Sequence, residues 1–60
     1  MNTTHIIGKY TVTAERLNEL SEDSAYFCIV YKDGKKVLSM TVHNATSPEE
    51  AAREASYYAV

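Results

Sequence analysis

The sequence predicts a small α+β domain: a three-stranded antiparallel sheet in β-β-β-α order, with one C-terminal helix packed on one face. Two runs rich in aromatic and β-branched residues meet at an Asp-Gly turn, and a third segment upstream alternates apolar and polar residues. The last segment opens with a helix-capping signature. We expect one domain over residues 1–60, with strands at 6–15, 25–32 and 35–43 and a helix at 48–59.

The hairpin is the strongest of these signals. Asp33-Gly34 favours a two-residue turn, because both residues tolerate the positive φ angles that match the strand twist. This turn pairs Val30 with Val37 and gives one face five apolar side chains, namely Phe27, Ile29, Leu38, Met40 and Val42. The opposite face then carries Tyr26, Cys28, Val30, Val37, Ser39 and Thr41. We expect the helix to cover the first face.

The segments before the hairpin are less uniform. In the predicted first strand Tyr10, Val12 and Ala14 share one face, while residues 1–5 are expected to be flexible. The first strand of the hairpin is apolar on both faces, which predicts a place in the middle of the sheet. Within 16–24, leucines at the start are compatible with one helical turn, and Ser21 to Ser24 are typical of a polar loop.

The C-terminal helix has a clear beginning. Ser47 is a favoured N-cap, Pro48 suits the first helical position, and Glu50 completes a capping box. Glu49 and Arg53 stand four residues apart and are expected to pair. A stripe of mostly small residues predicts close packing on the sheet: Ala51, Ala52, Ala55, Tyr58 and Ala59.

Length and composition limit the function. At 60 residues, apolar burial and chain entropy nearly cancel, so a homodimer or a bound partner would stabilise the fold. The net charge of −2 is too small to indicate a nucleic-acid surface by itself. A single cysteine, Cys28, excludes an internal disulfide and suits a reducing compartment. With no signal peptide and no membrane-length apolar run, a soluble, cytoplasmic protein is expected.

No catalytic, metal or cofactor site is predicted. In the expected register His43 faces Ser24, roughly 13 Å along the strand from Cys28, so the thiol lacks a base. His5 falls in the expected flexible terminus, and the histidines and cysteine lack the spacing of zinc sites. Gly8 and Gly34 are isolated rather than part of a phosphate-binding loop. A small enzyme with paired carboxylates remains open as a third alternative.

The sheet face that the helix leaves open predicts a protein interface. Exposed faces of antiparallel sheets are usually polar, whereas this one is half apolar. We expect a non-enzymatic protein-binding module, such as a small phage or bacterial inhibitor or adaptor, that binds a protein partner or associates with itself. The expected contact residues are Tyr26, Cys28, Val30, Val37 and Thr41.

The alternative hypothesis is nucleic-acid binding at the hairpin tip. An aromatic residue stands beside three lysines there, a pattern that suits phosphate contact and equally keeps an exposed hairpin soluble. These residues are Tyr31, Lys32, Lys35 and Lys36.

One resemblance bears on this alternative. From Phe27 to Val60, the order of strand, Asp-Gly-Lys turn, strand and Ser-x-x-Glu-Ala helix resembles the second half of a double-stranded-RNA-binding domain. Leu17-Asn18-Glu19-Leu20 is similar to the first helix of that family. The family's lysines at the start of the last helix are replaced by Pro48-Glu49-Glu50, and residues 21–24 leave no room for its first strand. Small antitoxin-like domains share the same order of elements.

Overall fold

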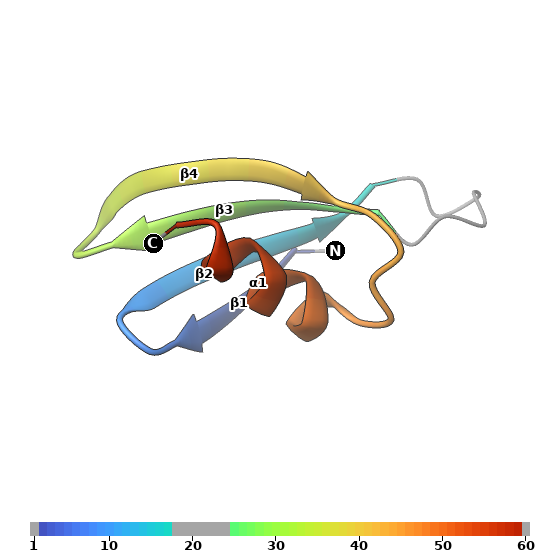
Figure 1. Cartoon of the computed structure of the whole chain (residues 1–60), viewed down its shortest axis with the longest axis horizontal. Helices are drawn as coiled ribbons and strands as arrows, with labels where there is room; N and C mark the ends of the chain where they lie inside the picture. Colours follow the sequence, from blue (N-terminus) through green and yellow to red (C-terminus); the bar gives the residue numbers. More distant parts are fainter. Residues whose placement is uncertain (1, 18–24, 60) are drawn as a thin grey trace.

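The computed structural model describes residues 2–17 and 25–59 and shows an antiparallel sheet with one helix lying across one face (Figure 1). Its elements are β1 (Asn2–Ile7), β2 (Tyr10–Arg16), β3 (Tyr26–Lys32), β4 (Lys35–Val42) and α1 (Pro48–Tyr57). The strands lie in the order β1-β2-β3-β4, so β3 is flanked on both sides, as predicted. The α+β class with a C-terminal helix is confirmed, but the predicted number of strands, three, is wrong, because the sheet has four.

The additional strand comes from a hairpin that the sequence reading treated as one strand, 6–15. Gly8 has a φ angle of +59° and opens a two-residue turn with Lys9, which the absence of a side chain makes possible. Ile7 therefore pairs with Tyr10, and the ladder runs back to Asn2 opposite Glu15. Residues 2–5, which were expected to be flexible, belong to β1.

The second hairpin has the predicted turn and a different register. Asp33 and Gly34 have φ angles of +54° and +78°, as the expected turn requires, and Lys32 pairs with Lys35. The register then shifts, so that Val30 pairs with Leu38 and Val37 is left as the extra residue of a β-bulge.

This bulge reverses the predicted face of β3, while Leu38, Met40 and Val42 of β4 lie on the face that α1 covers, as predicted. Side chains alternate along a strand, so one extra residue moves every later side chain of β4 to the other face. Leu38, Met40 and Val42 thereby share a face with Tyr26, Cys28 and Val30. That face is buried beneath α1. The predicted partners of the β4 residues, Phe27 and Ile29, lie on the opposite face.

Small residues allow the helix to lie close to the sheet. Ala51, Ala52 and Ala55 are fully buried on α1, and the fully buried side chains beneath are no larger than valine or cysteine. The predicted stripe is thus confirmed at its alanines. Tyr58 is an exception, being 65% exposed, and Ser56 is buried instead. The Ser56 hydroxyl donates to the Arg53 carbonyl at 2.7 Å, which satisfies the buried polar group.

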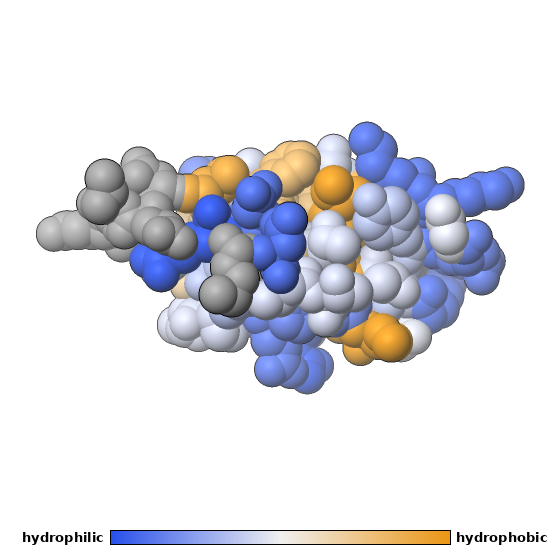
Figure 2. Space-filling view, turned by 180° about the vertical axis from the view of Figure 1, so that it is seen from behind, coloured by the Kyte–Doolittle hydropathy of each residue, from blue (hydrophilic) through white to orange (hydrophobic). Residues whose placement is uncertain are grey.

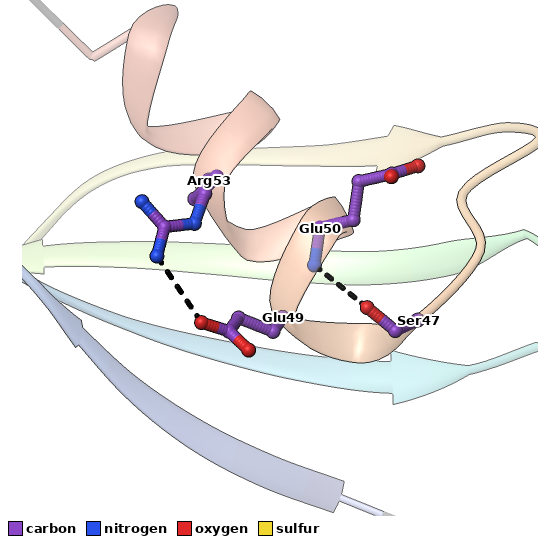
Figure 3. Close-up of polar contacts among 4 residues, drawn as sticks. All are labelled: Ser47, Glu49, Glu50 and Arg53. Atoms are coloured by element: carbon purple, nitrogen blue, oxygen red, sulfur yellow. Dashed lines mark hydrogen bonds and ion pairs between the residues drawn. The ribbon is translucent and has the colours of Figure 1, made fainter.

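The start of α1 has the predicted cap (Figure 3). The Ser47 Oγ accepts a hydrogen bond from the backbone N–H of Glu50 at 3.1 Å, and Pro48 is the first helical residue. The Glu50 carboxylate reaches back one residue further than the capping box requires. It accepts from the backbone N–H of Thr46 at 3.0 Å and from its hydroxyl at 2.9 Å.

These two hydrogen bonds predict a pH dependence of stability. Donation from the backbone N–H and then the hydroxyl of Thr46 lowers the pKa of Glu50 below the usual value of 4.5. A lowered pKa contributes stability above pH 4.5, and this contribution is lost as the pH falls through the folded-state pKa. Thr46→Val should raise the Glu50 pKa, measured by NMR titration of the carboxyl carbon. An unchanged pKa would show that the hydroxyl contributes nothing.

The end of β2 leads out of the described region. Arg16 closes β2, and the backbone N–H of Leu17 donates to the Ala25 carbonyl at 2.9 Å, continuing the ladder with β3. The helical turn and polar loop expected over 16–24 otherwise lie outside the described residues. Within the ranges 2–17 and 25–59, no helix is long and apolar enough to cross a membrane.

Candidate interaction surfaces

The sheet face away from α1, here called the outer face, carries a row of large side chains along its central part. Phe27, Ile29 and Tyr31 follow one another on β3, and all three are half-buried. Threonines flank the row: Thr11 and Thr13 on β2, and Thr41 on β4. Figure 2 shows this face, with patches of apolar colour among paler residues and hydrophilic side chains toward both ends and along the lower border. Ile6 on β1 adds an apolar side chain that is 81% exposed.

The predicted contact residues are mostly not on this face. Tyr26, Cys28 and Val30 are 6%, 0% and 0% exposed and form part of the core beneath α1, which corrects the prediction that they face outward. Val37 is 48% exposed at the bulge, and Thr41 lies half-buried on the outer face. The physical reason is the bulge, which puts Tyr26, Cys28 and Val30, instead of Phe27 and Ile29, on the face that carries Leu38, Met40 and Val42.

Cys28 is a core residue in this fold. It pairs with Ala14 on one side and Met40 on the other, and its Sγ lies 4.0 Å from the Tyr26 carbonyl. Burial raises the pKa of the Cys28 thiol, and the negative charge of Glu54 raises it further. The thiolate, which is the reactive form, is therefore disfavoured.

Lys9, which the sequence analysis did not single out, lies at the same end of the sheet as the three lysines of the second hairpin. Lys32 pairs with Lys35, Tyr31 pairs with Lys36, and all three lysines are exposed. Because Tyr10 pairs with Lys32, the turn of the first hairpin lies at the same end of the sheet, and it carries Lys9. The Lys9 Nζ lies 5.6 Å from the centre of the Tyr10 ring. Four of the six basic residues are thus at this end, called here the lysine end.

An open trough of about 520 Å³ lies between β1 and α1. Its floor is the segment Thr4–Gly8, and its wall is formed by Glu49 and Arg53 of α1. Arg53 donates to Glu49 at 3.2 Å, which confirms the predicted pair, and both side chains are largely exposed (Figure 3). Since the two charges balance, the trough selects neither an anion nor a cation strongly.

His5 also lines the trough, although the sequence reading had set it aside. Its Nε2 lies 2.7 Å from the Thr3 hydroxyl, which in turn donates to the Ala14 carbonyl at 3.4 Å. The hydroxyl is thus held by the first hairpin rather than presented to a ligand. Across ranges 2–17 and 25–59, no group of three or more His, Cys, Asp or Glu residues is placed to hold a metal ion.

The fold defines a small α+β protein with a four-stranded antiparallel meander, one face covered by α1 and one face on which no other element of residues 2–17 and 25–59 lies. Comparisons of the chain with models of known families, with curated proteins and with solved structures find no match. The functional argument therefore rests on the chain's own surfaces.

Proposed function

We propose that this chain is a non-enzymatic protein-binding module that acts through its outer face. The observation that supports the proposal is the row Phe27, Ile29 and Tyr31 on β3, which has no covering layer among the described residues. A sheet face that meets only water usually carries polar side chains. Apolar side chains gathered on the surface of a small protein typically mark an interface.

The surroundings of this row indicate the chemistry of the partner. Threonine hydroxyls on both sides can donate and accept hydrogen bonds, as the polar rim of an interface requires. At one end Tyr31 is paired with Lys36, whose charge favours acidic groups on the partner. The surface that fits best is an apolar patch on another protein with an acidic border near the lysine end.

Ile29→Lys tests this proposal, because Ile29 is at the centre of the row and its cross-strand neighbours are Thr13 and Ser39. The new charge faces water in the free protein and would be buried in the complex. Tyr57→Lys is the matched control, since Tyr57 is 68% exposed on α1 in the opposite layer. Each protein is immobilised and used to capture partners from a lysate of the source cell, with and without nuclease.

A protein retained by the wild type and by Tyr57→Lys, but lost with Ile29→Lys, is the expected result. Because a buried unpaired charge costs several kcal/mol, the loss of binding should exceed ~100-fold. Retention that Ile29→Lys does not reduce would contradict the proposal, as would the absence of any retained protein.

Nucleic-acid binding remains the second candidate, favoured by the four lysines that the register brings together at the lysine end. The same capture experiment separates the two functions. If nucleic acid is retained, nuclease should remove it. Retention by Ile29→Lys together with loss in Lys36→Glu would identify the lysine end as the binding surface. Such binding should also weaken steeply with salt.

A further inference from the structure

The two edges of the sheet are built differently. The outer edge of β4 carries Lys35 and Lys36 and a bulge at Val37, features that hinder the addition of another strand. β1 contains no Asp, Glu, Lys or Arg, no proline and no register shift. Among the described residues no backbone lies along the outer edge of β1. β1 is therefore the edge open to a further strand.

Hydrogen bonding inside the sheet shows which backbone groups of β1 point outward. The Leu17 N–H donates toward β3, to Ala25. Residues of an antiparallel strand bond alternately to their two neighbours, so every second residue from Tyr10 to Ala14 bonds to β1. Their partners on β1 are Thr3, His5 and Ile7. The backbone N–H and C=O groups that point away from the sheet consequently belong to Asn2, Thr4 and Ile6.

A second copy of the chain matches this edge. Its β1 can pair antiparallel about a two-fold axis, because the outward donors and acceptors recur at the same spacing in both copies. Directly opposed side chains share a face. To keep both helices on the same side of the sheet, outward-bonding residues must oppose each other. In two such registers, Thr4 lies opposite Thr4 of the second copy or opposite its Ile6.

The distribution of charge favours the antiparallel arrangement. The Tyr10 hydroxyl donates to the Ala59 carbonyl at 3.3 Å, so α1 ends near the lysine end and begins toward the other. Glu15, opposite Asn2, and Glu49, in the first turn of α1, lie toward that other end together with Arg16, the last residue of β2. Antiparallel pairing of the two β1 strands keeps the lysine ends of the two copies apart, whereas parallel pairing would place them side by side.

From these observations we infer that the chain forms a two-fold homodimer in which β1 pairs with β1 of a second copy. The sheet then continues through both copies, and the helices lie on the same side. Neither the outer face nor the lysine end is covered. The dimer is thus independent of the proposed partner binding, and Ile29→Lys should leave it intact.

Two proline variants test the inference by analytical ultracentrifugation. Thr4→Pro removes an outward N–H from β1, and its ring obstructs a neighbouring strand without breaking the β1–β2 ladder. Thr41→Pro is the matched control, since the same alternation directs the Thr41 N–H outward from β4. The wild type and Thr41→Pro should sediment as dimers, and Thr4→Pro should raise the dissociation constant by at least ~100-fold.

Hydrogen exchange in the wild-type protein gives a second test that needs no variant. In an isolated chain the N–H groups of Thr4 and Ile6 point to solvent and exchange fast. In the dimer they are hydrogen-bonded, so their exchange should slow and should accelerate on dilution, while the N–H groups of Ser39 and Thr41 remain fast. A wild type that is monomeric up to ~1 mM, which excludes any dimer tighter than that, overturns the inference. Fast exchange of the Thr4 and Ile6 N–H groups in a dimer also overturns the inference. A dimer that Thr4→Pro leaves intact overturns it as well.

Discussion

Tyr26→Glu is expected to unfold the protein. Tyr26 is 6% exposed beneath α1, and its replacement removes roughly 2–3 kcal/mol of apolar burial. Holding a carboxylate at that position, or protonating it there, costs several kcal/mol more. A domain of 60 residues is stable by about 3–9 kcal/mol at the usual values per residue. The substitution thus removes most or all of the stability, and circular dichroism should show loss of the folded spectrum at 25 °C.

Tyr31→Glu is the control within the same strand. Tyr31 lies on the outer face beside Lys36, so a carboxylate there remains hydrated and meets a positive charge. We expect a change in the free energy of unfolding of less than ~1 kcal/mol, measured by urea denaturation. If Tyr26→Glu stays folded while Tyr31→Glu unfolds, then the faces of β3 are the reverse of those described.

The features predicted correctly from sequence are those determined by residues close together in the chain. Asp33-Gly34 specifies its turn through the φ angles of those two residues. Ser47 and Glu50 specify the start of α1 through hydrogen bonds that span three or four residues. In each case the interacting groups are close neighbours, so no knowledge of the remaining fold is required.

The face of β3 could not be predicted in this way. Both of its faces are apolar, so hydrophobic pattern alone allows either to be buried. A regular ladder from the Asp33-Gly34 turn groups Phe27 and Ile29 with the apolar residues of β4, so the sequence analysis predicted that their face is the buried one. The fold instead uses a bulge at Val37, which places smaller residues such as Cys28 beneath the alanines of α1. Phe27 and Ile29 are bulkier than Cys28 and Val30 and would hold the helix further from the sheet, whereas the bulky residue on the buried face, Tyr26, is at the first position of β3. The choice thus depends on packing between segments distant in the sequence.

The first hairpin was missed because its signal was weak. A glycine at the first position of a two-residue turn is sufficient for the turn, but Gly8-Lys9 lacks the Asn-Gly or Asp-Gly pair that marks hairpins most clearly. The strand before it, Asn2–Ile7, is polar over its first half. Its pairing with β2 places His5 beside the trough and makes β1 an edge of the sheet. The dimer interface proposed at β1 therefore could not be predicted from the sequence alone.

The same bulge separates two valines whose truncation should have very different effects. Val30 is fully buried at the centre of β3, whereas Val37 is 48% exposed at the bulge. Val30→Ala leaves a cavity among residues that cannot all move to fill it, and should cost about 2–3 kcal/mol. Val37→Ala removes the same atoms from a position largely in water and should cost less than ~0.5 kcal/mol.

Urea denaturation of both variants measures this difference directly. In a regular ladder without the bulge, Val30 and Val37 would be cross-strand neighbours on one face, with similar burial and similar costs. Equal destabilisation by the two substitutions would therefore contradict the bulge, and with it the burial of Tyr26 and Cys28. A large cost at Val30 with almost none at Val37 would place the bulge at Val37 and leave Phe27, Ile29 and Tyr31 on the face available to a partner.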